Sequence, residues 1–254
     1  MGIGALFSKR PLWGMFALRT LLAESPRCFC FFLQKRKLGL IYIRGTNLIN
    51  AKAQSKIMDN NNKKIAGLFF IVAVVQYVLV IVVSEAIYSG YSVEQQMVSE
   101  LGDWSLAGNN AAIFNTSAIL WSLFFIVGTF YIHRVFRNRL FTSLLAICGF
   151  GSLVPGFVAL NISFEVHGLF ALVAFIFAAA SAIMSYKFLK SPLSYISVIL
   201  GVITLSAMGL FMLGQSNSAF FLGLGLGGIE RLALYPILFW MLGFGGYLIG
   251  SSSD

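Results

Sequence analysis

The amino-acid sequence predicts an all-α polytopic membrane protein, a bundle of six transmembrane helices, and two observations carry that prediction. Hydrophobic residues make up 58% of the 254 residues, charged residues only 11%, and the mean hydropathy is +0.85. A soluble domain with this composition would expose large apolar patches. Six apolar runs are also long enough to cross a hydrocarbon core of roughly 30 Å, which takes about 20 helical residues.

The six runs contain no Lys, Arg, Asp or Glu, and they lack the alternating pattern of barrel strands. Backbone groups in lipid must be hydrogen-bonded within their own segment, so helices are the structure that we expect for them. They belong to one transmembrane domain, residues 58–254. The predicted helices cover about 65–83, 111–132, 140–160, 166–186, 193–214 and 232–250.

Residues 1–57 form a basic N-terminal segment that carries the whole net charge of +9, while the rest of the chain is neutral overall. The segment has no apolar run long enough for a spanning helix or a signal-peptide core. Two interpretations stay open: the segment is disordered, or the natural chain begins at Met58, ahead of "DNNNKKIAGLFF". Because the charge is confined to this segment, we expect membrane lipids as partners and no nucleic acid.

The basic residues of the short connections predict how the chain is oriented. Lys63 and Lys64, the "HRVFRNR" connection, and finally Lys187 and Lys190 fall on alternate connections, and the connections between them are acidic. Lys and Arg are retained in the cytoplasm during membrane insertion. The sequence therefore predicts a protein of the cell (cytoplasmic) membrane whose core N- and C-termini are both cytoplasmic.

The stretch "GGIERLALYPILFW" places a charged pair at the mouth of the last predicted helix. Arg231 is the only basic residue on the predicted outer side, where six carboxylates lie. An unpaired arginine near hydrocarbon costs about 3–10 kcal/mol, so Arg231 needs a partner or a ligand. We expect Glu165 or Glu100 as its counterion, because the adjacent Glu230 points in a different direction.

Other polar residues near the same predicted end converge on this cluster. Tyr235 stands one helical turn from Arg231 on the same face, and Asn115 and His167 lie at the beginnings of the second and fourth predicted helices. Two interpretations stay open: a ligand or proton site, or interhelical hydrogen bonds that only hold the bundle together. The candidate ligand-binding residues are Arg231, Glu230, Tyr235, Glu165, His167, Asn115 and Glu100.

The sequence contains no catalytic or metal-binding motif, so we expect no enzymatic activity, no metal and no cofactor. Its two histidines fall on opposite predicted sides, and there is no "GxSxG" motif. The glycine-rich "GLGLGG" follows no strand and has no accompanying lysine. This pattern favours a flexible, close-packing connection over a phosphate-binding loop.

Small residues and prolines point to two further functions. Ala174, Ala178 and Ala182 recur every four residues and form a smooth stripe. A second copy of the chain, or a partner in a membrane complex, would dock closely on such a face. The prolines of "LVPGF" and "LYPIL" interrupt two predicted helices in their outer halves, as in the broken helices of a transporter's binding site.

Four stretches carry a family resemblance: "VSELG", "AAIFNTS", "FEVHGLFALVAFIF" and "GGIERLALYPILFWMLGFGGYLIG". With their spacing they resemble the prokaryotic, mostly archaeal membrane family known as domain-of-unknown-function 998, over about residues 64–250. "SELG" ahead of "IF" is also similar to the Frag1/DRAM/Sfk1 group, which is linked to lipid handling. The first resemblance implies six helices, no assigned activity, and motif positions at Glu100, Asn115, His167, Glu230, Arg231 and Tyr235.

These observations favour a non-enzymatic membrane protein whose outer polar cluster binds a lipid headgroup or a small anion. In this hypothesis Arg231 supplies the positive charge. Two alternatives stay open. One is a proton-coupled secondary transporter in which Glu165, His167 or Glu230 titrates, and the other is a structural subunit that docks through the alanine stripe.

Overall fold

The structure is a computed structural model that describes residues 26–252, with side chains from residue 53 onward. The chain divides into two units, Met1–Lys56 and Ile57–Asp254, and the second contains the helical bundle. Residues 1–25, which belong to the basic N-terminal segment, lie outside the described residues. Residues 26–57 are helical, and both interpretations of the N-terminal segment stay predictions.

Six helices in the described part of the chain are long and apolar enough to cross a membrane. This confirms the predicted fold class, and each of the six predicted runs falls mainly within one of these helices. The helices are α2 (Pro26–Ile87), α3 (Ala111–Phe136), α4 (Arg139–Phe157), α5 (Phe164–Met184), α6 (Leu193–Gly214) and α7 (Gly225–Gly250).

Several helix ends differ from the predicted ones, and three of these differences have a physical reason in the structure. α7 begins at Gly225 rather than near residue 232, because its two charged residues find partners within the protein and do not mark the helix end. α2 runs past residue 83 to Ile87 for the same reason, since its last turn carries one of those partners. α4 stops at Phe157, directly after a Pro-Gly pair that is unfavourable in a helix.

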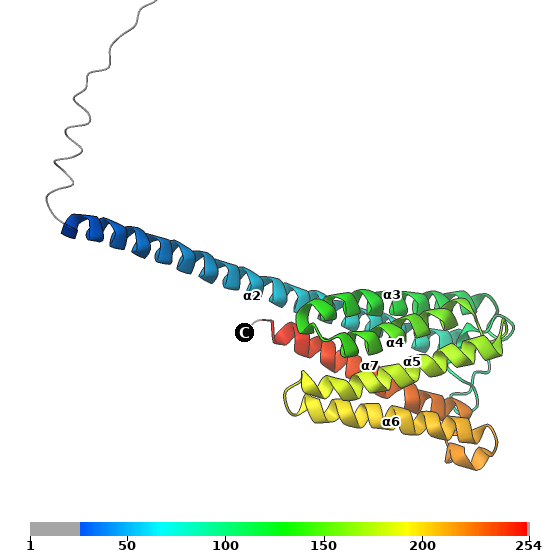
Figure 1. Cartoon of the computed structure of the whole chain (residues 1–254). Coiled ribbons are helices and arrows are strands. Elements are labelled where there is room, and N and C mark those ends of the chain that lie inside the picture. Colours follow the sequence, from blue (N-terminus) through cyan, green and yellow to red (C-terminus); the bar gives the residue numbers. More distant parts are fainter. Residues whose placement is uncertain (1–25, 253–254) are drawn as a thin grey trace, which may run out of the picture. The chain divides into compact units, whose positions relative to one another are not determined.

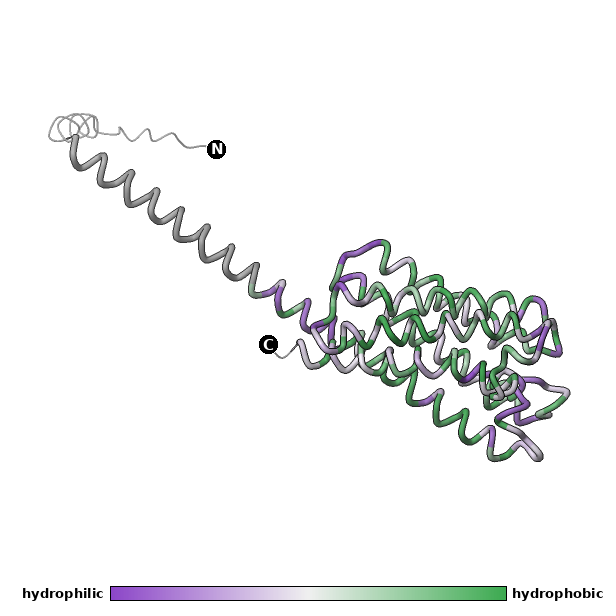
Figure 2. Tube along the Cα trace, turned by 90° about the horizontal axis from the view of Figure 1, so that it is seen from below, coloured by the Kyte–Doolittle hydropathy of each residue, from purple (hydrophilic) through white to green (hydrophobic). Residues whose placement is uncertain are grey.

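Consecutive helices are antiparallel, so the connections gather at the two ends of the bundle (Figure 1). Figure 2 shows hydrophobic residues along the helices and many of the hydrophilic ones near these ends. One end, here named the acidic end, carries Glu85, Glu94, Glu100, Asp103, Glu165 and Glu230. The other, the basic end, carries Lys63, Lys64, Arg134, Arg137, Arg139, Lys187 and Lys190.

Each helix from α3 to α7 packs against the next one along the chain. The bundle is closed by α2, which contacts α3 on one side and α7 on the other. Glycines make both contacts close: a Cβ atom on Gly128 of α3 would lie 2.6 Å from the Phe70 ring of α2, and one on Gly67 would lie 2.5 Å from the carbonyl oxygen of Gly245 in α7. The first and last spanning helices of the described residues, α2 and α7, thus meet backbone to backbone, as small residues allow in membranes.

Aromatic side chains fill the bundle from its middle toward the basic end. The rings of Phe70 and Phe125 stack with centroids 5.0 Å apart, and Phe244 lies 5.6 Å from Trp240 and 5.9 Å from Phe141. All five side chains are fully buried. We name these five residues the aromatic layer.

We predict that Gly67→Ala destabilises the bundle by about 1–3 kcal/mol, because the new methyl group meets the Gly245 carbonyl and the two backbones have to separate. The measurement is the thermal unfolding midpoint of the protein in detergent. Gly246→Ala is the matched control, since a Cβ at this neighbouring position meets nothing within 4 Å. Equal midpoints for the two variants would contradict the proposed close contact.

Candidate functional site

Arg231 fixes the connection 88–110 to the first turns of α7. Its side chain is 8% exposed and forms an ion pair with Glu85 at 2.6 Å. The same guanidinium donates hydrogen bonds to the Tyr91 hydroxyl at 2.6 Å and to the carbonyl oxygens of Val93, Gln96 and Gly227 at 2.9, 3.1 and 3.0 Å. We name this set of contacts the arginine anchor.

The "GLGLGG" glycines allow the connection to approach α7 this closely. A Cβ atom on Gly227 would lie 2.1 Å from the Gln96 carbonyl oxygen, and the Gly227 amide donates to the Glu94 carbonyl at 2.9 Å. Gly225 has a φ of +68°, a left-handed conformation that favours glycine. The predicted close packing of these glycines is confirmed, but four of the six residues, 225–228, form the beginning of α7 rather than part of a connection.

The predicted counterion of Arg231 is wrong. The ion pair is made with Glu85, in the last turn of α2, and not with Glu165 or Glu100. Glu85 lies beyond the point where the apolar run ends in the sequence, so its helical position next to α7 was not apparent. The prediction that Arg231 requires a partner is confirmed.

We predict that Arg231→Ala lowers the free energy of unfolding by about 3 kcal/mol, because it leaves Glu85 and several carbonyl groups without their partner. Thermal or chemical unfolding in detergent measures this loss. Arg134→Ala is the control: Arg134 is exposed at the basic end, 4.4 Å above the Phe130 ring, and its loss should cost less than about 1 kcal/mol. Similar costs for both variants would contradict the anchor.

Two polar side chains, Asn115 of the predicted cluster and Gln76 of α2, link separate structural elements. Asn115 is 7% exposed and donates to the Gly102 carbonyl at 2.9 Å, which ties α3 to the short 3₁₀ helix η1 (Ser99–Gly102). Gln76 of α2 donates to the Ser117 carbonyl at 3.1 Å and accepts from the Ser117 hydroxyl at 2.7 Å. These contacts match the interhelical interpretation of these residues.

The connection 88–110 holds two groups whose pKa values are shifted. Burial raises the pKa of the Tyr91 hydroxyl, so it stays protonated and donates to the Met97 carbonyl at 2.9 Å while accepting from Arg231. Burial, and then the nearby Asp103 carboxylate, raise the pKa of Glu100. A carboxyl group with a raised pKa is harder to ionise in the folded protein than in the unfolded chain.

We predict that Glu100→Gln stabilises the protein at neutral pH and makes no difference at acid pH. The folded state binds the Glu100 proton more tightly, so stability falls as pH rises from the ordinary pKa of a glutamate through the raised one. The gain should be less than about 1 kcal/mol, since the group is only partly buried. Unfolding midpoints of both proteins across this pH range measure it, and a gain that persists at acid pH would contradict the ionisation argument.

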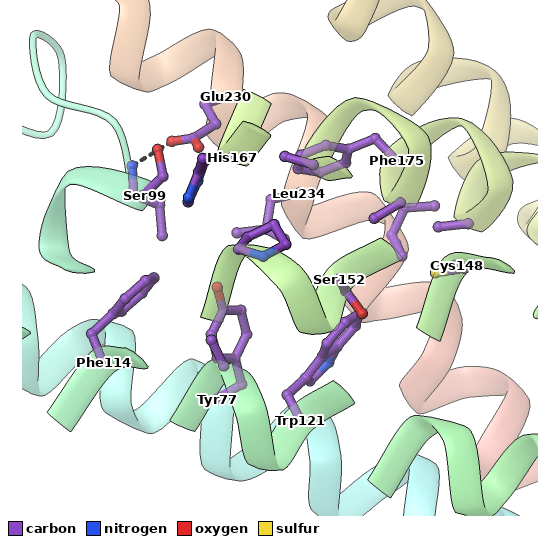
Figure 3. Close-up of a pocket in the computed structure, with 17 residues that line it drawn as sticks. Tyr77, Ser99, Phe114, Trp121, Cys148, Ser152, His167, Phe175, Glu230 and Leu234 are labelled. Atoms are coloured by element: carbon purple, nitrogen blue, oxygen red, sulfur yellow. Dashed lines mark hydrogen bonds between the residues drawn. The ribbon is translucent and has the colours of Figure 1, made fainter. Parts of the chain in front are cut away.

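A cavity of about 110 Å³ lies inside the bundle, between the aromatic layer and the acidic end. Figure 3 shows Glu230, His167 and Ser99 together at one end of it, and Trp121, Ser152 and Cys148 at the other. The wall between these ends is apolar. Five helices contribute to it, α2 through Tyr77, α3 through Phe114, α4 through Pro155, α5 through Phe175 and α7 through Leu234.

Glu230 and His167 are the ionisable side chains of the polar end, and both form hydrogen bonds with neighbouring residues, Glu230 with Ser99 as well as with Val98. The Glu230 carboxylate accepts a hydrogen bond from the Val98 amide, at the beginning of η1. His167, 6% exposed, has its Nδ1 atom 2.8 Å from the Val158 carbonyl oxygen. Only a protonated Nδ1 can donate to that carbonyl, so the Nε2 atom of the neutral ring is an acceptor.

A groove of about 370 Å³ runs between α5 and α6 and shares Ser99, His167 and Glu230 with the cavity. Its rim is apolar and open: Phe164, Leu169 and Met212 are 61%, 59% and 53% exposed. Glu165 lies at this rim, where its carboxylate accepts from the Ser163 hydroxyl at 3.2 Å. The cavity inside the bundle and the groove at its surface therefore adjoin at the residues that they share.

The residues that line the cavity and the groove include Glu230, Glu165 and His167 but no Lys or Arg. The positive charge nearest to Glu230 along the chain, on Arg231, is engaged in the arginine anchor. Within the described part of the chain, no group of three or more His, Cys, Asp or Glu side chains is placed to hold a metal ion.

Comparison with known proteins gives a family for the chain. Residues 71–247 match the family described as "Protein of unknown function (DUF998)". The chain belongs to the DUF998 family. No curated protein and no solved structure matches the chain. The resemblance drawn from the sequence motifs is thereby confirmed for this family.

The structure of this DUF998 protein separates the predicted site residues into two groups. Glu230, His167 and Glu165 line the cavity or the groove. The other four, which line neither, are Arg231, Glu100, Asn115 and Tyr235. Adjacent residues of α7 thus have different roles, since Arg231 holds the connection and Glu230 lies at the cavity.

The alanine stripe of the DUF998 protein lies inside the bundle. Ala178 and Ala182 are 3% and 0% exposed, and a Cβ atom on Gly151 of α4 would lie 3.3 Å from the Ala174 amide nitrogen. Ala174 and Ala178 also line the cavity. The stripe lets α4 approach α5 and leaves space for the cavity, and it is not an exposed docking face. Formation of an oligomer stays a prediction, but the alanine stripe no longer serves as its docking face.

Sequence reasoning missed the residues that shape the cavity, among them Tyr77, Ser99 and Trp121. Tyr77 and Trp121 lie in apolar runs and look like ordinary core residues. The available signal was the concentration of small residues on α5, where Gly168, Ala171, Ala174 and Ala178 leave room that larger side chains would fill.

Proposed function

We propose that the protein binds one lipid-like molecule inside the membrane, with its polar head at Glu230 and His167 and its apolar part in the cavity and the groove. The observation that carries this proposal is that the two spaces adjoin, since both are lined by Ser99, His167 and Glu230. Binding sites for small molecules are mostly apolar spaces with a few polar groups that fix orientation. This combination is found here.

The position of the opening supports a ligand that comes from the bilayer. The groove lies between α5 and α6, both long and apolar enough to span a membrane, and its exposed rim residues are apolar. Such a rim would face lipid tails rather than water. A molecule with an apolar chain can enter sideways from the bilayer without its chain crossing water.

The orientation that we propose places this groove in the outer leaflet of the cell membrane. Seven basic residues lie at the basic end, which by the positive-inside rule is the cytoplasmic side. The core termini are then cytoplasmic, and the acidic end, with the polar head of the site, faces outward.

The proposed role is binding, and two observations favour it over the alternatives. The aromatic layer lies between the cavity and the basic end, so its tight packing supports a closed binding site rather than a passage for transport. The hypothesis of a structural subunit assumed that the alanine stripe is an exposed docking face, and Ala178 and Ala182 are buried. We assign no reaction to the site.

We predict that Gly168→Leu blocks the groove and reduces the lipid that copurifies with the protein by about tenfold, a change of about 1.4 kcal/mol in binding. Gly168 lines the groove, and a Cβ atom there meets nothing within 4 Å, so the larger side chain should fold normally. Native mass spectrometry and lipid extraction of the purified protein measure the bound lipid.

Gly209→Leu is the matched control. Gly209 is an exposed glycine of α6 whose Cβ position is also free, and it lines neither the cavity nor the groove. This variant should keep the bound lipid of the unaltered protein. Equal lipid content in both variants, or no lipid in the unaltered protein in native membranes or nanodiscs, would contradict the proposed function.

A further inference from the structure

We infer that the lipid bound by this protein has a head that donates hydrogen bonds and carries no negative charge, such as a hydroxyl or an ammonium group. This inference rests on the proposed function and names the class of ligand that the same site takes. It is argued from the charges and hydrogen-bonding capacity at the polar end, where the cavity and the groove meet.

The polar end offers hydrogen-bond acceptors. When ionised, Glu230 has two oxygens with about four acceptor lone pairs. Val98 and Ser99 donate to this carboxylate and do not use all of that capacity. The Nε2 atom of neutral His167 is an acceptor, because Nδ1 is directed at the Val158 carbonyl. A ligand that donates hydrogen bonds would satisfy both groups at once, and a carboxylate inside a membrane protein needs such a partner.

The charges exclude an anionic head as the preferred ligand. Two carboxylates, Glu230 and Glu165, line the path from the rim to the cavity, and no Lys or Arg lines it. Arg231, the basic residue that the sequence hypothesis assigned to an anion, is turned away into the anchor and has five hydrogen-bonded contacts there. A phosphate in this place would be partly removed from water and would find no positive charge in the lining, which is strongly unfavourable.

One further group in the cavity wall suits a ligand with a polar atom. Trp121 is 8% exposed and lines the cavity below the polar end (Figure 3). Its indole N–H has no hydrogen-bond partner among the described residues. A buried donor without a partner is costly, and a ligand oxygen beneath the head would supply the missing acceptor.

The test compares three single-chain lipids of equal chain length: an alcohol, a primary amine and a phosphate monoester. The full-length protein in an uncharged detergent is titrated with each lipid near neutral pH, and binding is measured by native mass spectrometry and by isothermal titration calorimetry. We expect the alcohol or the amine to bind at least about tenfold more tightly than the phosphate ester. The order of alcohol and amine then tells which donor head the site prefers.

Glu230→Gln is the diagnostic variant, since it keeps an oxygen for the Val98 amide and removes the charge. It should reduce the preference over the phosphate ester about tenfold. Glu94→Gln is the control, because it removes one charge from an exposed position of the same end that lines neither space. His167→Asn is a second variant that keeps a donor for the Val158 carbonyl and removes the Nε2 acceptor. It should also weaken binding of the preferred lipid.

The outcomes separate the two proposals. Tighter binding of the phosphate ester, or an unchanged preference in both Glu230→Gln and His167→Asn, overturns the inferred head group and leaves lipid binding intact. The proposed function itself is overturned if none of the three lipids binds and if Gly168→Leu does not lower the amount of copurifying lipid.

Discussion

The arginine anchor is the interaction on which the acidic end of the bundle depends. A guanidinium in a membrane-spanning helix has to be neutralised and fully hydrogen-bonded, and Arg231 meets both needs with Glu85, Tyr91 and three carbonyl groups. These partners belong to the last turn of α2 and to the connection that follows it. The anchor therefore holds this connection in place, and residues of the connection form the wall of the cavity at the acidic end.

The cavity follows from the anchor and from the distribution of small residues. With the connection in place, η1 begins beside α7, where the Val98 amide binds Glu230 and Ser99 reaches the polar end. Farther into the bundle, small residues on α5 leave space for the cavity, and the aromatic layer bounds it on the side of the basic end. The result is a mostly apolar cavity with one polar end, which adjoins an open groove between α5 and α6.

The number of helices and their approximate bounds could be predicted from the sequence, because length and apolarity alone decide what crosses a membrane. The need of Arg231 for a partner was predictable for the same reason. Its identity was not, since Glu85 and Arg231 are far apart along the chain and their proximity depends on how α2 meets α7. His167 and Glu230 could be named from their chemistry, whereas Trp121 and Tyr77 have no sequence feature that distinguishes a cavity wall from a packed core.

The contact between Gly67 and Gly245 has a consequence for biogenesis. Helices enter the bilayer in the order of their synthesis, so among the spanning helices of the described residues α2 enters first and α7, which packs against it, enters last. During translation the face of α2 that will meet α7 is exposed to lipid. Glu85 has no ion-pair partner until Arg231 is synthesised, 146 residues later. Chain assembly thus ends with a single late closure, and a chain truncated before its final helix would leave an unpaired carboxylate for membrane quality control to detect.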